Sequence, residues 1–154
     1  MYVGLPAHNM SEQVAAYFDL DGTLLDASSE KSLTSTLTKR RPWRIPLSIT
    51  AWSLRFVGSL LTGKSVYDSA RNRGHLTMAS WQMLDDISLE LVQSKLAQRV
   101  SLEARQRISW HKEQGHRLVL VTATVQPMAE AMASELGMDC VYGCGPANRQ
   151  GRLS

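Results

Sequence analysis

The chain has 154 residues, of which 44% are hydrophobic and 20% charged, and its formal net charge is +3. This composition is that of an ordinary globular chain with enough apolar residues for one modest core. The mild positive charge permits an anionic substrate, but the basic residues are not interleaved with aromatic residues in a repeating way, so we expect no nucleic-acid partner.

An apolar strand and an acidic loop come first in chain order. After a loose leader at residues 1–12, Val14–Phe18 predicts a short strand, and Asp19-Leu20-Asp21-Gly22 follows it. Residues i and i+2 of an extended segment point the same way, so the two aspartates can reach one site. That site would lie at the carboxyl edge of a sheet, where open α/β sheets bind ligands. The alternative is a common Asp-Gly turn.

Helices are expected over most of the next 85 or so residues. The first begins at Ser29, with Ser28 or Ser29 as N-cap, and runs toward Lys39. Pro42 ends this stretch, because proline disfavours helix in the residue before it. The remaining helices are expected over Ile45–Leu61, Val66–Arg73, Met78–Val100 with a break near Asp85 and Asp86, and Leu102–Gln114.

A second apolar strand, Leu118–Val121, ends at Thr122. A helix over Gln126–Leu136 and a strand over Cys140–Tyr142 follow. Strands separated by helices indicate parallel pairing, so the sequence predicts an α/β fold with a parallel sheet.

The string D-x-D-G-T-L after a strand resembles motif I of the haloacid dehalogenase-like hydrolases. Arg117–Thr124 resembles their motif II, and Ala133–Asp139 and Gly151–Ser154 resemble the segments that follow it. The spacing of about 90 residues between the motifs suits subfamily IB, which is similar to phosphoserine phosphatase. The resemblance implies a Rossmann-like three-layer core at residues 13–28 and 101–154, and an inserted helical cap at residues 29–100.

The resemblance also implies a Mg²⁺-dependent phosphomonoester hydrolase that works through an aspartyl-phosphate. Asp19 would be the nucleophile, and Asp21 the general acid and then the general base. The side chain of Asp19 and the backbone carbonyl of Asp21 would bind Mg²⁺. The hydroxyl of Thr122 and the backbone N–H groups of Gly22 and Ala123 would bind a phosphoryl oxygen. The alternative for Thr122 is a plain strand-terminal threonine.

Two family motifs have no counterpart in the chain. The motif III lysine and the motif IV acidic pair would come later, and no residues follow Ser154 to supply them. We therefore expect an incomplete core with impaired activity, and the alternative is a non-catalytic truncated fragment. In the family, the motif IV strand lies beside the motif I strand. Without it the first strand would be an open apolar edge, so we expect self-association.

The substrate would be a small or lipid-linked phosphomonoester. Phosphoserine phosphatases usually have D-x-D-S-T and a glutamate nine residues after the first aspartate. Here Gly22 and Ser28 hold those positions and Glu30 is two residues away, which weakens a phosphoserine assignment.

A basic cluster at residues 39–44 around Trp43 precedes the apolar run Ile45–Leu61. This pattern fits contact with anionic lipid, as in a membrane-surface module of a larger lipid-phosphate-processing protein. The length of the run and its internal Arg55 argue against a membrane span. We favour a buried cap helix with a solvated basic turn.

The cysteine, histidine and tryptophan residues give little indication of a catalytic or metal site. Cys140 and Cys144 are expected to be reduced thiols, and no signal peptide is evident, so a cytoplasmic enzyme fits best. The four histidines, His8, His75, His111 and His116, are expected at the surface or in packing. Trp52, Trp81 and Trp110 are expected in the core.

Overall fold

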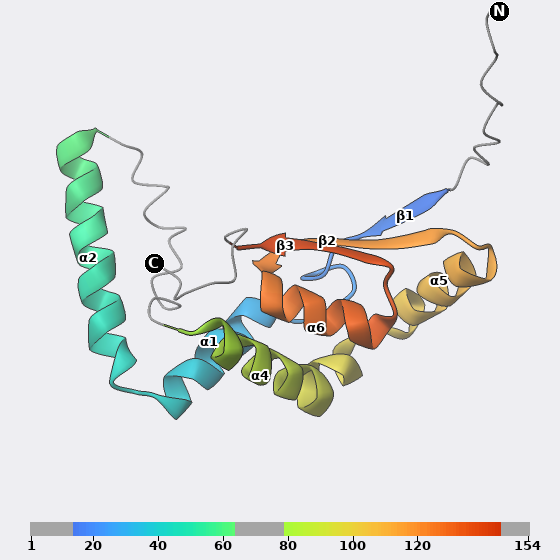
Figure 1. Cartoon of the computed structure of the whole chain (residues 1–154), viewed down its shortest axis with the longest axis horizontal. Coiled ribbons are helices and arrows are strands. Elements are labelled where there is room, and N and C mark those ends of the chain that lie inside the picture. Colours follow the sequence, from blue (N-terminus) through green and yellow to red (C-terminus); the bar gives the residue numbers. More distant parts are fainter. Residues whose placement is uncertain (1–13, 64–78, 146–154) are drawn as a thin grey trace, which may run out of the picture.

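The computed structural model describes residues 14–63 and 79–145 (Figure 1). Three parallel strands form one sheet in the order β1-β2-β3: β1 is Ala15–Phe18, β2 is Arg117–Val125 and β3 is Cys140–Cys144. In the register, Phe18 pairs with Leu120 and Val121 with Tyr142. The expected α/β fold with a parallel sheet is confirmed.

Helices connect these strands, and serine and glycine residues mark their ends. The hydroxyls of Ser28, Ser80 and Ser101 cap the N-termini of three helices. Of the two serines expected as N-cap of the first helix, Ser28 is therefore the one that caps it. Gly63 and Gly137 end two helices in the left-handed conformation that glycine adopts without strain. The helical elements are α1 (Ser29–Arg40), α2 (Arg44–Thr62), α4 (Trp81–Leu91), a π-helical turn (Val92–Leu96), a 3-10 turn (Ala97–Arg99), α5 (Leu102–Glu113) and α6 (Gln126–Leu136). The helix expected at residues 66–73 lies outside the described residues.

Several expected boundaries differ from the structure, and strand β3, for example, runs to Cys144 and does not end at Tyr142. Helix α4 is not broken at Asp85 and Asp86, because Leu84, Ile87 and Leu91 continue one buried stripe past the two exposed carboxylates. The regular α-helix instead ends after Leu91. Strand β2 also runs past Val121, because Val125 pairs again with β3 after an irregularity in the register.

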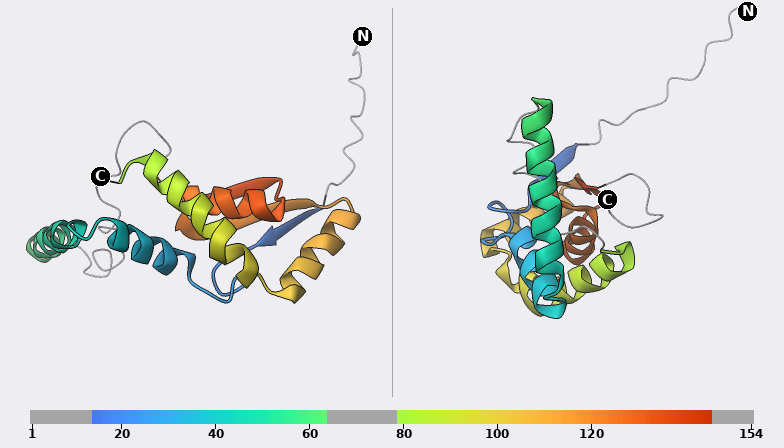
Figure 2. Two further views of the ribbon diagram at one scale, coloured as in Figure 1. Left: turned by 90° about the horizontal axis from the view of Figure 1, so that it is seen from below. Right: turned by 90° about the vertical axis from the view of Figure 1, so that its left-hand side faces the viewer.

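The core lies between the sheet and the helices on one of its faces. Leu118 and Leu120 of β2, Met128 and Met132 of α6 and Leu84 of α4 are all almost fully buried. Helix α6 contacts β2 and β3, and α4 packs on α6. Figures 1 and 2 show α4, α5 and α6 on this same side of the sheet.

The opposite sheet face is largely exposed within the described part of the chain, although Val119 on this face is 5% exposed. Tyr17, Val121 and Tyr142 point to this face and are 71%, 44% and 62% exposed. The second helix layer of a three-layer core is therefore not seen among the described residues. Strand β1 has β2 as its single partner in the described sheet, so its outer edge is open there.

Helix α2 stands apart from this core (Figure 1). None of its described side chains is buried, so the expectation of a buried cap helix is wrong. By length and composition alone, its segment Ile45–Thr62 would be able to cross a membrane, so the argument from length and from Arg55 against a span is wrong. Trp81 is buried as expected, but the expectation is wrong for Trp52 and Trp110, which are 41% and 45% exposed. At the surface, Trp52 stacks on Phe56 and Trp110 meets His111 edge-on.

Candidate active site

The predicted acidic residues lie at the carboxyl end of the sheet. Asp19 directly follows β1, whose last pairing joins Phe18 to Leu120 of β2. Thr122 comes two residues after Leu120 on the neighbouring strand, so both predicted residues lie just beyond the same rung. The side chain of Asp19 is exposed, that of Asp21 is half-buried and that of Thr122 is buried.

A tight turn anchored in the core presents the two aspartates. The carbonyl of Leu20 accepts hydrogen bonds from the N–H groups of Leu24 and Leu25 at 3.1 and 2.9 Å. These three leucines are at most 2% exposed, which fixes the turn on the core. Gly22 has φ +82°, a left-handed conformation that side chains with a Cβ rarely adopt.

One backbone N–H that was predicted to bind phosphate already donates a hydrogen bond within this turn. The N–H of Gly22 donates to the carbonyl of Leu25 at 2.9 Å. It is therefore not available to a phosphoryl oxygen in this conformation. Ala123, the other predicted backbone donor, lies exposed on β2.

A chain of hydrogen bonds connects Asp21 to Thr122. Both carboxylate oxygens of Asp21 accept from the backbone N–H of Ser29, at 3.0 and 3.1 Å. The Ser29 hydroxyl lies 2.8 Å from the Thr124 hydroxyl, and the N–H of Thr124 donates to Thr122 Oγ1 at 3.2 Å. Ser29 and Thr124 are 0% and 3% exposed, so the link is shielded from water. It joins the acidic loop, the start of α1 and β2.

This arrangement holds the acidic loop and leaves one hydroxyl free to donate. Ser29 is the first residue of α1, so a backbone N–H at a helix N-terminus fixes the position of the Asp21 carboxyl group. The Thr122 oxygen accepts from Thr124, which leaves the hydroxyl hydrogen of Thr122 to be donated elsewhere. Thr23 donates a long hydrogen bond of 3.5 Å to Asp19.

Sequence reasoning missed Ser29 and Thr124 as site residues. For Thr124 a signal exists, because alternate residues of a strand share a face and Thr122-Ala123-Thr124 repeats a hydroxyl at that spacing. For Ser29 the signal was its place at a helix start, but its contact with Asp21 depends on how the loop folds.

The donor set fits part of a Mg²⁺ site. The Asp19 carboxylate is exposed, and the carbonyls that close the turn are those of Leu20 and Leu25, not that of Asp21. Mg²⁺ keeps several waters and often binds one or two protein carboxylates together with substrate phosphate. Within residues 14–63 and 79–145, no group of three or more His, Cys, Asp or Glu side chains gathers at a possible metal position.

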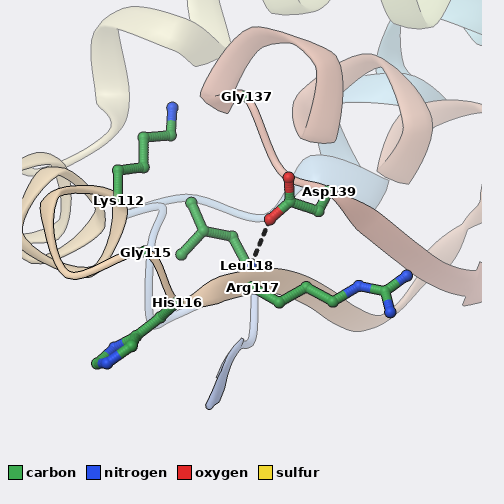
Figure 3. A pocket seen from close by; sticks show the side chains of 7 residues that line it. All are labelled: Lys112, Gly115, His116, Arg117, Leu118, Gly137 and Asp139. Carbon is green, nitrogen blue, oxygen red and sulfur yellow. Dashed lines mark hydrogen bonds between the residues drawn. The ribbon is translucent and has the colours of Figure 1, made fainter. Parts of the chain in front are cut away.

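A hollow of about 370 Å³ lies at the other end of the sheet (Figure 3). Its lining residues are Lys112, Gly115, His116, Arg117, Leu118, Gly137 and Asp139. Asp139 Oδ2 accepts from the N–H of Leu118 at 2.7 Å, and Lys112 Nζ donates to the carbonyl of Leu136 at 3.0 Å. These two polar side chains therefore fasten the start of β3 and the end of α6.

Two histidines meet beside this hollow. The Nδ1 atoms of His111 and His116 are 2.9 Å apart. Burial lowers the pKa of His111 below 6.5, and the neighbouring His116 and Arg107 lower it further. The ring of His111 also meets the ring of Phe18 edge-on, which confirms a packing role.

Residues 16–154 match the model of the haloacid dehalogenase-like hydrolases. The chain therefore belongs to this family, as the motif I and motif II segments predicted. No curated protein sequence matches the chain significantly.

Two solved structures share the fold. A protein of unknown function from Bordetella pertussis Tohama I is 23% identical with a TM-score of 0.64, and the match covers 92% of this chain and 65% of that one. A phosphoserine phosphatase, solved as a phospho-aspartyl intermediate analogue, is 15% identical with a TM-score of 0.51, and the match covers 92% and 60%. The chain thus spans less than two thirds of the length of either protein.

Proposed function

We propose that this chain carries the nucleophile and the acid–base group of a Mg²⁺-dependent phosphomonoester hydrolase that works through an aspartyl-phosphate. The observation that carries the proposal is the hydrogen-bonded link from Asp21 through Ser29 and Thr124 to Thr122, beside the exposed carboxylate of Asp19. Two carboxylates at the carboxyl end of a parallel strand suit this chemistry in a member of a hydrolase family.

The proposed roles follow from the contacts of each group. The exposed Asp19 carboxylate attacks phosphorus, forming an aspartyl-phosphate as the ester P–O bond breaks. The leaving alkoxide takes a proton from Asp21, and Asp21 later accepts a proton from the water that cleaves the aspartyl-phosphate. The Ser29 N–H holds Asp21 in place for both transfers. The Thr122 hydroxyl donates to a phosphoryl oxygen.

The metal would neutralise charge on the phosphoryl group. The carboxylate of Asp19 and the carbonyl of Asp21 would hold Mg²⁺. We expect weaker hydrolysis by this chain than by a longer form that adds a lysine and a second acidic pair. The alternative is a non-catalytic fragment, which is favoured by the hydrogen bond that already uses the Gly22 N–H and by the incomplete set of metal ligands among residues 14–63 and 79–145.

The substrate class in this proposal is a small or lipid-linked phosphomonoester rather than phosphoserine. Ser28, nine residues after Asp19, is engaged as the N-cap of α1 and accepts from the N–H of Lys31. Residues 13–28 and 101–154 would form the catalytic core, residues 29–100 the cap, and the cytoplasm would be the location. The open edge of β1 would support self-association.

Hydrolysis of p-nitrophenyl phosphate with and without Mg²⁺ tests this function. We expect Asp19→Asn to lower the Mg²⁺-dependent rate by at least about 1,000-fold, because an amide is a far weaker nucleophile than a carboxylate. Asp26→Asn is the matched control, since Asp26 is an exposed carboxylate of the same chain. A measurable rate that Asp19→Asn leaves unchanged would contradict the proposal, and no rate above the uncatalysed reaction would favour the non-catalytic alternative.

A further inference from the structure

Helix α2 presents an apolar surface that the described fold does not use. Its exposed side chains include Leu54 and Leu61, which are 75% and 82% exposed. Within the described residues it packs extensively against no other element, and Figures 1 and 2 show it projecting from the core. A soluble chain rarely leaves so many large apolar side chains together in water without a partner for them.

Five of the apolar residues of α2 form a continuous stripe, and the exposed leucines Leu47, Leu54 and Leu61 lie on the opposite side of the helix. Ile45, Ile49, Trp52, Phe56 and Leu60 recur at helical spacing, and Trp52 and Phe56 stack with ring centroids 5.2 Å apart. None of the five is buried. Small or polar residues at positions 48, 51, 55 and 62 follow a separate side of the helix, between these two apolar sides. An amphipathic helix of this kind can lie flat on an apolar boundary.

The net charge of α2 and the residues before it indicates which kind of apolar boundary the helix would contact. Residues 31–63 contain six Lys or Arg residues and no Asp or Glu, so they carry +6. Since the whole chain carries +3, the remaining residues carry −3. Lys39 and Arg41 are exposed just before α2, and Trp43, which is 53% exposed, lies between them and the apolar stripe. Arg40 of this basic turn forms an ion pair with Glu90.

We propose that α2 and the basic turn at residues 39–43 dock in the plane of an anionic phospholipid surface. The apolar stripe enters the boundary of the acyl chains, Trp43 lies at the level of the headgroups, and Lys39 and Arg41 meet the lipid phosphates. A second copy of the chain would bring the same positive segment against itself, which disfavours a dimer through α2. The inference does not depend on the proposed hydrolysis.

Co-flotation of the chain with lipid vesicles tests this docking surface. We expect binding to phosphatidylcholine vesicles that contain phosphatidylglycerol and little binding to phosphatidylcholine alone. Removing two charges in Lys39→Gln/Arg41→Gln should weaken binding by at least about tenfold. The matched control is Lys95→Gln/Arg99→Gln, which removes two exposed charges elsewhere and should bind like the parent.

The apolar stripe is tested by Ile49→Gln/Leu60→Gln, which replaces two exposed residues of the stripe and keeps a good helix former at each position. Since neither residue lies in the core, the thermal unfolding midpoint should stay unchanged while vesicle binding is lost. The proposal is overturned by absent binding, by equal binding to neutral vesicles, or by binding that the glutamine variants retain. Binding that resists alkaline carbonate would indicate a spanning helix instead. An α2-dependent dimer that does not bind vesicles would also overturn it.

Discussion

The two ends of the β-sheet use similar polar side chains for different purposes. At the amino end, Asp139 and Lys112 line a hollow, but their polar atoms fasten the backbone of β2 and α6. At the carboxyl end, Asp19 extends into solvent from a tight turn, and Asp21 is held by the N-terminus of α1. The hollow at the amino end is therefore lined by polar side chains that hold the backbone together. The candidate active site is identified by the exposed carboxylate of Asp19 at the carboxyl end of the sheet, and not by the presence of a hollow.

After Asp19→Asn, the largest loss of turnover at the carboxyl end should come from Asp21→Asn. Asparagine keeps an oxygen that can accept from the Ser29 N–H, so the fold should stay intact, but it cannot transfer a proton. We expect a loss of about 10²- to 10⁴-fold in turnover, the usual range for a general acid–base group. Turnover of an alkyl phosphate should fall more than that of p-nitrophenyl phosphate, because an alkoxide needs the proton more. An equal loss for both substrates would contradict the acid role.

The buried hydroxyl pair at the carboxyl end should have an intermediate effect on stability. Thr124→Val keeps the side-chain shape but leaves the Ser29 hydroxyl without its partner, and we expect a loss of about 1–3 kcal/mol in unfolding free energy. Ser29→Ala should cost a similar amount for the same reason. The double variant should cost less than the sum of the two, since it leaves neither hydroxyl unpaired. Additive losses in urea unfolding would show that the pair is not coupled.

The smallest effect is expected at the amino end. Asp139→Ala removes the acceptor for the Leu118 N–H and should lower the unfolding free energy by about 1 kcal/mol. Asp139→Asn keeps an acceptor oxygen and serves as the control. Both variants should hydrolyse p-nitrophenyl phosphate at the parent rate at temperatures where they are folded. A loss of turnover in Asp139→Asn would indicate that the amino end of the sheet takes part in catalysis, which would contradict this account.

Much of the fold follows from local pattern. Gln126–Leu136 is correct at both ends because Gly137 ends the helix and the apolar spacing before it is regular. Alternating strands and helices also predicted the parallel sheet. The exposure of α2 could not be predicted from the sequence, because periodicity shows that a helix has an apolar side and does not show what covers that side. The same limit applies to Trp52 and Trp110.

Less of the site could be predicted. The positions of Asp19 and Thr122 at one sheet edge follow from strand order, and the structure confirms this placement. The contact between Asp21 and Ser29 joins residues eight apart through a loop, and that between Ser29 and Thr124 joins residues 95 apart. No local pattern encodes such contacts. The use of the Gly22 N–H by Leu25 likewise depends on the shape of the turn.

The most direct test of the central claim is to trap the covalent intermediate. The chain would be mixed with p-nitrophenyl phosphate and Mg²⁺, quenched in acid, digested and examined by mass spectrometry for an acyl phosphate. The account predicts a phosphoryl group on Asp19 that hydroxylamine removes and that is absent from Asp19→Asn. Turnover without such a group, or a phosphoryl group on another residue that persists in Asp19→Asn, would contradict the account.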